Sequence, residues 1–205
     1  IAKINHLQYV IAVKADKPWK TIDDLLNYIR TNTKKVVYGR TGYLTVLLND
    51  LLLSKAKIDT PISIVPYKGV GAQILSILKG DTDYMVQIYL GLMPYVESKE
   101  LRVLGVIDNK RVEALPGVPT LKESGYDIAE TMWISVLAPK GTPEDIVQKL
   151  SLTFDKIAKD KSFVSMLKKM NIPLNYEDRK TFEKTWEYEY KLYGDLLEKL
   201  GLKKK

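Results

Sequence analysis

The chain has 205 residues, of which 45% are hydrophobic and 28% charged, as expected for a globular protein with one ordinary core or two small ones. It contains no cysteine, which excludes disulfides, thiolate nucleophiles and cysteine-based metal sites. The single histidine, His6, excludes a His-rich metal site and leaves a Ser-His-Asp hydrolase dependent on one residue at the start of an apolar run.

The net charge of +7 brings nucleic-acid binding into consideration. However, the lysines are scattered among acids, and the dense basic run is confined to residues 202–205. We interpret the excess as surface charge that favours small anions, and we expect no nucleic-acid partner. No apolar run approaches the roughly 20 residues of a membrane span. The chain opens at Ile1 without a leader-like segment, so we expect a processed or truncated product.

The first part of the chain alternates apolar, β-branched runs with helical patterns. In KTIDDLLNYIR the apolar residues recur on one helical face, and Thr21 with Asp24 is typical of a capping box. The helix in VGAQILSILKG is expected to stop at Gly80. We predict one α/β domain up to about Val118, with a mostly parallel sheet covered on both faces. Its strands are expected at Tyr9–Val13, Val36–Tyr38, Ile62–Val65, Tyr84–Ile88 and Leu101–Ile107.

The pattern changes after Arg111, where LPGVPTLKESGYDI is typical of a connection. One more strand is expected at Trp133–Leu137. A helix then follows, with Thr142 as its cap and Pro143 in its first position. A last helix is expected from roughly Lys180 to Leu200. Beyond Pro139 the sequence indicates amphipathic helices and no convincing sheet, so we expect these helices to cover strands that lie elsewhere.

Two loops of the first part follow strands and precede helices, namely YGRTGYLTV (residues 38–46) and PYKGVGAQ (residues 66–73). In an open α/β sheet, ligands bind beyond the carboxyl ends of strands, where helix amides favour an anion. The polar side chains available there are Arg40, Thr41, Thr45 and Lys68. Neither loop is a phosphate-binding fingerprint, and tight turns without any ligand remain an alternative for both.

Three further residues have two readings each. Gln87 ends the strand after the second loop, where it is either a structural amide or a ligand contact. Tyr67 and Trp133 suit aromatic packing as well as ligand binding. The tyrosine-rich WEYEYKLYG (residues 186–194) is interpreted as helix surface with a core stripe.

Longer segments resemble the substrate-binding proteins of tripartite tricarboxylate transporters, the TctC or Bug family. These segments are VPYKGVGAQILSILKGDTDYMVQ, LMPYVESKELRVLGVIDNKRVEALPGVPTLKESGY and WISVLAPKGTPEDIVQKL. The upstream KTIDDLLNYIRTNTKKVVYGRTG is similar to the family's pattern as well. The resemblance covers nearly the whole chain in order, and its specificity comes from the combination of motifs.

The resemblance implies a type II periplasmic-binding-protein-like α/β fold. Residues 1–120 would form one fairly complete lobe, and residues 121–205 a hinge return with C-terminal helices of the other lobe. The implied protein is monomeric, needs no cofactor or metal, is not an enzyme, and lies outside the cytoplasm, in the periplasm or on a lipid anchor. It would deliver a small carboxylate to membrane permease subunits. The implied ligand contacts are Thr41, Gly42, Thr45, Tyr67, Lys68, Gly69 and Trp133.

Several positions depart from the family pattern. Arg40 replaces a small hydroxyl residue and adds a cation to the expected site. Gln87 replaces a common aspartate, which would disfavour amino-group ligands relative to plain di- or tricarboxylates. A long N-terminal portion of the family pattern, including its first ligand loop, has no counterpart here.

Three alternatives stay open at this point. The first is the ligand-sensing domain of a transcription regulator, which shares the two-lobed architecture. The second is an enzyme using Asp and Lys chemistry, although no acid pair stands out. The third is a nucleic-acid binder.

Overall fold

The computed structural model describes residues 1–199, apart from the side chains of residues 196 and 199. The chain divides into two compact units. Unit 1 combines Ile1–Leu7 with the chain from Trp133 onward, and unit 2 is Gln8–Met132. The expected helix end at Leu200 and the basic run 202–205 lie outside the described residues.

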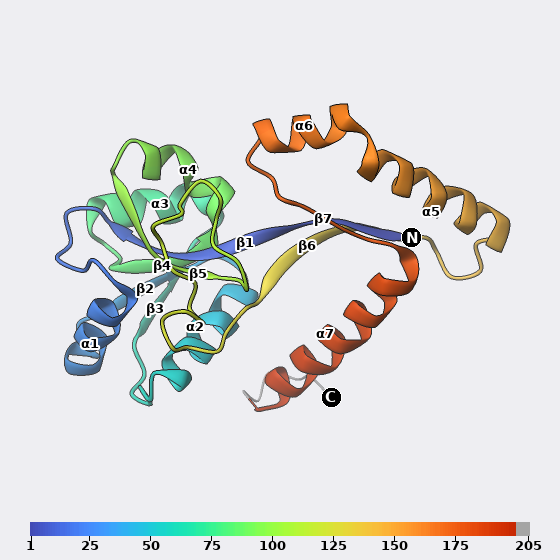
Figure 1. Cartoon of the computed structure of the whole chain (residues 1–205). Coiled ribbons are helices and arrows are strands. Elements are labelled where there is room, and N and C mark those ends of the chain that lie inside the picture. Colours follow the sequence, from blue (N-terminus) through green and yellow to red (C-terminus); the bar gives the residue numbers. More distant parts are fainter. Residues whose placement is uncertain (200–205) are drawn as a thin grey trace. The chain divides into compact units, whose positions relative to one another are not determined.

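Unit 2 is built on a mixed sheet with the strand order β3-β2-β4-β1-β5 (Figure 1). Its strands are β1 (Ala2–Lys14, which begins in unit 1), β2 (Val37–Arg40), β3 (Ser63–Pro66), β4 (Tyr84–Ile88) and β5 (Leu101–Ile107). Strand β2 runs parallel to β3 and β4, whereas β1 is antiparallel to β4 and β5.

The prediction of a mostly parallel sheet is therefore right for four of these strands and wrong for β1. Two strands joined through a helix are parallel only when the connection returns to the edge of the sheet at which the first strand began. The segment after β1 makes no such return, because β2 starts at the edge where β1 ends.

Two helix layers cover this sheet. Helices α1 (Ile22–Asn32) and α2 (Leu44–Lys55) pack on one face, and α3 (Val70–Lys79) and α4 (Tyr89–Glu97) on the other. The alternation along β1 shows the division, because Ile11 and Val13 join the first core and Val10 and Ala12 the second. Burial on both faces explains why β1 is continuously apolar from Tyr9 to Val13.

Local signals in unit 2 act as the sequence predicts. Thr21 Oγ1 accepts the Asp24 N–H at 3.2 Å, and Asp24 Oδ2 accepts the Thr21 N–H at 2.9 Å, which completes the capping box of α1. Gly80 ends α3 in the left-handed conformation with φ of 86°.

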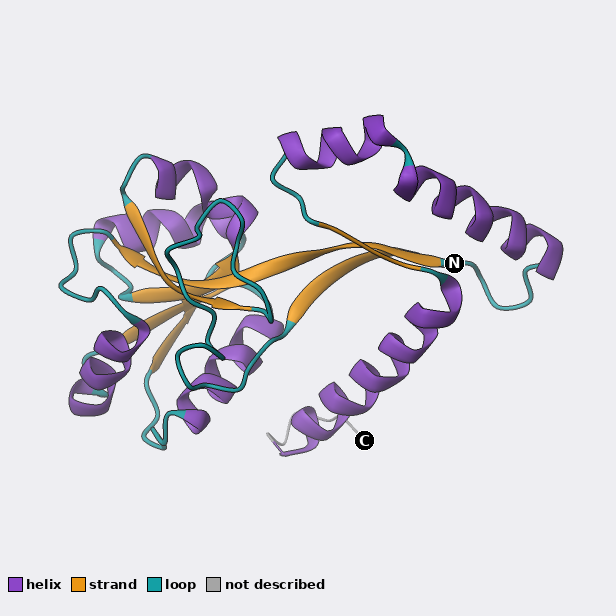
Figure 2. Cartoon of the chain, viewed as in Figure 1, coloured by secondary structure: helices purple, strands orange, loops and turns teal. Residues whose placement is uncertain are grey.

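Unit 1 contains β6 (Thr131–Val136, entering at Trp133), α5 (Glu144–Lys159), α6 (Lys161–Lys169), β7 (Leu174–Glu177) and α7 (Arg179–Lys199), shown in Figure 2. The expectation of no strand beyond Pro139 is wrong, because β7 pairs with Lys3 and Asn5 of β1. So short a strand carries little periodicity of its own, and its partner lies at the other end of the chain.

The start of α5 also differs from the prediction. The helix begins at Glu144, with Pro143 as its N-cap, and the Thr142 hydroxyl donates to the Pro139 carbonyl at 2.8 Å instead of capping the helix. The loop bond satisfies Thr142, and acids at Glu144 and Asp145 face the helix dipole.

Apolar side chains remain exposed on the helices of unit 1. Leu152 of α5 is 56% exposed and Met166 of α6 is 48% exposed. The buried apolar set of these helices is small, with Val147, Ala158, Leu167 and Phe182 below 9% exposure. No described helix combines the length and the apolar character that a bilayer crossing requires.

Candidate functional site

The carboxyl ends of three parallel strands meet at one edge of the sheet in unit 2. Strands β2 and β3 pair up to Arg40 and Pro66, so the loops that follow them start side by side. The Tyr67 N–H donates to the Arg40 carbonyl at 2.9 Å and joins the two loops directly. The structure thus brings Arg40, Thr41, Gly42, Tyr67, Lys68 and Gly69 to the same edge.

Two glycines give these loops their shape. Gly42 has φ of 69° and Gly69 has φ of 104°, conformations that L side chains rarely adopt. Gly69 is the N-cap of α3 and Tyr43 that of α2, and neither helix has a side-chain cap hydrogen bond. The first turns of both helices therefore have no side-chain capping partner, as at anion-binding helix termini.

Thr45 supports the first loop from beneath. Its side chain is buried, and its hydroxyl lies 3.2 Å from the Thr41 carbonyl and 3.3 Å from that of Gly42. The Tyr38 hydroxyl donates to the Thr45 carbonyl at 2.7 Å. Burial raises the pKa of Tyr38 far above its ordinary value, so the phenol stays a neutral donor. Thr45, in the first turn of α2, therefore holds the loop in place through the hydrogen bonds of its hydroxyl to the Thr41 and Gly42 carbonyls.

Two cations lie at this edge. The Arg40 guanidinium lies 5.7 Å from the Tyr43 ring centroid, a cation–π contact that leaves its N–H groups available. Lys68 is exposed. Their positive charge adds to that of the helix amides.

Gln87 is a buried amide with both N–H donors and one carbonyl lone pair in use. Its Nε2 donates to Thr41 Oγ1 and to Gln73 Oε1, each at 2.9 Å, and its Oε1 accepts the Ile88 N–H at 2.8 Å. Gln73 Nε2 in turn donates to the Gly39 carbonyl at 2.7 Å. Gln73 is not among the predicted site residues, although a glutamine on the apolar face of α3, beside Ile74 and Ile77, is a usable signal.

Trp133 belongs to unit 1, where it is part of an aromatic cluster. Its ring lies 5.1 Å from that of Phe182 and 5.4 Å from that of Trp186, measured between centroids. Its indole N–H donates to the Glu189 carboxylate. These contacts show Trp133 in aromatic packing within unit 1, and a contact of its ring with a ligand stays a prediction. His6 likewise has a structural partner, since its Nδ1 lies 2.7 Å from Asn175 Nδ2.

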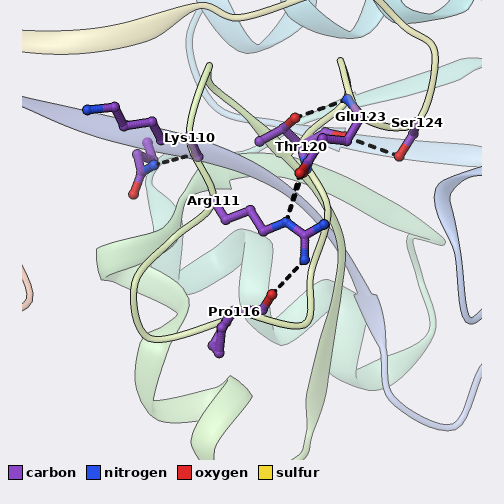
Figure 3. Close-up of polar contacts among 7 residues, drawn as sticks. Lys110, Arg111, Pro116, Thr120, Glu123 and Ser124 are labelled. Carbon is purple, nitrogen blue, oxygen red and sulfur yellow. Dashed lines mark hydrogen bonds and ion pairs between the residues drawn. The ribbon is translucent and has the colours of Figure 1, made fainter.

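The KRVEALPGVPTLKES segment folds onto itself in unit 2 (Figure 3). Arg111 Nη1 donates to the Pro116 carbonyl at 2.7 Å, and Arg111 Nε pairs with Glu123. Gln8 Nε2 donates to the Lys110 carbonyl at 3.0 Å and ties the segment to β1. These residues form a structural clamp and are not among the candidate ligand contacts.

A cavity of about 510 Å³ lies within unit 1, between the start of α5 and α7. Arg179 in its wall pairs with Glu144 and Glu183. None of the predicted site residues lines this cavity. In the described part of the chain, no group of three or more His, Cys, Asp or Glu side chains is placed to hold a metal ion.

Parallel strand ends, helix N-termini without side-chain caps and a long antiparallel strand within the sheet define a mixed α/β fold with an edge suited to an anion. The family model for the tripartite tricarboxylate transporter family receptor, TctC, matches residues 1–202, and the chain belongs to this family. Its fold and family are those of solute-binding proteins and not of enzymes.

Individual relatives agree with this family. The UPF0065 protein in the gbd 5' region of Cupriavidus necator is 33% identical over 95% of this chain and 59% of its own length. The crystal structure of a TctC solute-binding protein from Polaromonas has a TM-score of 0.82 at 26% identity, covering 97% of this chain and 68% of that one. The R. palustris protein Rpa4515, described with adipate, has a TM-score of 0.83 at 24% identity, covering 98% and 68%. The chain thus spans about three fifths of the curated relative's length.

Proposed function

We propose that this chain belongs to an extracytoplasmic solute-binding protein that captures a small organic carboxylate and delivers it to the permease of a tripartite tricarboxylate-type transporter. The observation that carries the proposal is the convergence of two uncapped helix N-termini, α2 and α3, beside Arg40 and the Thr41 hydroxyl. A carboxylate offers several strong acceptors, and charge-assisted hydrogen bonds to it contribute about 1.5–3 kcal/mol each.

The proposed contacts divide into two groups. Arg40, Thr41, Gly42, Tyr67, Lys68 and Gly69 would face the carboxylate through side chains or backbone amides. Thr45 and Gln87 would act from beneath the first loop, because their side chains are buried and already hydrogen-bonded to it. Trp133 would contribute from the other lobe of the intact protein.

Unit 2 would be the more complete lobe, and the helices of unit 1 would belong to the other one. The exposed apolar side chains of α5 and α6 support this assignment, as does the greater length of the relatives. Closure of the two lobes would enclose the ligand, and the permease would recognise the closed state. The protein would act as a monomer without catalysis.

Adipate enters as a candidate through the R. palustris neighbour, which shares the fold. Plain dicarboxylates also suit Gln87, which places no negative charge beneath the site to attract an amino group. The transcription-regulator alternative has no support, because the family that matches is a transporter receptor family.

Isothermal calorimetry of the intact protein with succinate, malate, glutarate, adipate, citrate and glutamate tests the proposal. We expect binding in the micromolar range for at least one plain carboxylate and weaker binding of glutamate. The Thr41→Val variant should weaken the best ligand about ten- to a hundredfold. Failure of every acid to bind would overturn the proposal.

A further inference from the structure

A chain of buried hydrogen bonds runs beneath the first loop and ends at Thr41. It leads from the Ile88 N–H to Gln87 Oε1 and from Gln87 Nε2 to Thr41 Oγ1. A branch leads from Gln87 Nε2 to Gln73 Oε1 and from Gln73 Nε2 to the Gly39 carbonyl. Gln73 is 0% exposed and Gln87 is 4% exposed, so water does not substitute for these partners.

The direction of every bond in this chain is fixed by the backbone at its two ends. A peptide N–H can only donate, so Ile88 requires the oxygen of Gln87. A peptide carbonyl can only accept, so Gly39 requires the nitrogen of Gln73. With both amides held in this way, the Gln87 nitrogen necessarily faces Gln73 Oε1 and Thr41 Oγ1. Neither side chain can flip without placing two donors or two acceptors together in a buried site.

A consequence follows for the Thr41 hydroxyl. Its oxygen accepts from Gln87, which leaves its single proton to be donated elsewhere. Among the described residues no side chain or carbonyl is hydrogen-bonded to that proton, and Thr41 is partly exposed at the strand edge. The Gln87 N–H occupies one lone pair of Oγ1 and cannot accept a proton, so the Thr41 O–H is directed away from Gln87 and is available to a ligand acceptor.

We propose that Gln73 and Gln87 are positioning residues that turn the Thr41 proton toward the site, so that the loop favours a ligand oxygen acceptor such as a carboxylate. This inference rests on the proposed carboxylate function and assigns the specificity of its first loop to two buried amides. Gln73 acts through Gln87, since it holds the Gln87 nitrogen toward Thr41.

Calorimetry on the intact protein tests the inference, with succinate, malate, glutarate and adipate as probes. The variants are Gln87→Met and Gln73→Met, which keep the length of the side chain without its amide, alone and combined with Thr41→Val. Thr41→Ser serves as the matched control, because it retains the hydroxyl. Circular dichroism and thermal melts establish that each variant is folded.

With the tightest of the four acids, each Met variant should weaken binding about three- to tenfold, because the hydroxyl must then be ordered by the ligand itself. In the Thr41→Val background the same substitutions should add less than twofold, whereas Thr41→Ser should bind within about threefold of wild type. Equal losses in both backgrounds would overturn the inference, since they would indicate a general structural effect.

A second measurement needs no ligand and separates this inference from the function on which it rests. The side-chain amide protons of Gln87 should exchange slowly with solvent by NMR in the wild type and rapidly in Gln73→Met. Rapid exchange in the wild type overturns the inference even if the acids bind. Slow exchange with no acid bound establishes the hydrogen-bond chain but overturns the carboxylate function, and with it the selective role of Thr41.

Discussion

Arg111 and Glu123, 12 residues apart, form an ion pair in which the single Nε–H of the guanidinium is shared between the two carboxylate oxygens, at 3.1 Å and 2.9 Å. Glu123 Oε2 also accepts the Thr120 N–H at 2.8 Å, and the Glu123 N–H donates to Thr120 Oγ1 at 3.1 Å. The pair closes the loop that joins β5 to the rest of unit 2 (Figure 3). Glu123 thus stabilises the loop both through its ion pair with Arg111 and through its hydrogen bond with the Thr120 backbone N–H.

This pair makes the loop sensitive to acid. The Arg111 side chain, followed by the Thr120 N–H, holds the pKa of Glu123 below its ordinary value of 4.5. The folded protein therefore keeps Glu123 ionised to lower pH than the unfolded chain does. The contribution to stability is complete above about pH 4.5 and is lost as the pH falls through the lower folded pKa.

Urea unfolding of wild type and Glu123→Gln across this range measures the contribution. The difference in unfolding free energy should be constant above about pH 5 and shrink below pH 4.5. Arg111→Met should reduce the same acid-dependent difference, since it removes the other partner. Parallel pH curves for wild type and Glu123→Gln would contradict the expectation.

Local signals made the helices of unit 2 predictable from the sequence. The capping box of Thr21 and Asp24 and the glycine end of α3 depend on residues three or four apart, so the sequence contains all the information they need. The direction of β1 and the existence of β7 were missed because both depend on pairings between distant segments. The β7 residue Glu177, for instance, pairs with Lys3 across 174 positions.

The candidate site was predictable to a similar degree. Loops after parallel strands locate the binding edge, and family motifs point to Thr41 and Lys68. Whether Gln87 is a ligand contact or a structural amide stayed open, because only its distance of 2.9 Å to Thr41 Oγ1 reveals its partner. The role of Gln73 could not be predicted from the sequence. A polar residue on an apolar helix face indicates a buried hydrogen bond only once its acceptor, here the Gly39 carbonyl, is known.

Gly69 and Gly71 should respond in opposite ways to alanine. Gly69 has φ of 104°, so Gly69→Ala should lower the unfolding free energy by about 1–2 kcal/mol and weaken ligand binding. Gly71 lies inside α3 with open space around an added Cβ, so Gly71→Ala should be neutral or stabilise by up to about 1 kcal/mol. Thermal melts compare the two, and equal destabilisation would show that Gly69 is not the N-cap of α3.

Tyr126 should ionise only in strong base. Burial, then its hydrogen bond to Asp23 Oδ1 at 2.7 Å, raises the pKa of Tyr126 to about 12. Because the folded pKa lies above the unfolded one, the stabilisation is present below pH 10 and is lost as the pH rises through about 12. Subtracting the phenolate absorbance of Tyr126→Phe from that of wild type isolates this titration. Asp23→Asn should lower its midpoint toward 10, and an unchanged midpoint would refute the contribution of Asp23.

Asp83 joins the start of β4 to β2 through its side chain and its backbone. Its Oδ2 accepts the Val37 N–H at 2.9 Å, its own N–H donates to the Val37 carbonyl at 2.8 Å, and its Oδ1 pairs with Lys17 at 2.8 Å. Asp83→Ala removes the side-chain acceptor of a strand amide, so it should lower the unfolding free energy by about 1–3 kcal/mol.

Lys17→Met should cost about 0–1 kcal/mol in the same assay, because that partner is partly exposed and the Val37 bond remains. Asp81→Ala, an exposed acid two positions away, provides the control and should stay within about 0.5 kcal/mol of wild type. If Lys17→Met and Asp83→Ala destabilise equally, the ion pair and not the backbone bond holds the two strands together. The amide of Val37 should then exchange with solvent as fast in wild type as in Asp83→Ala.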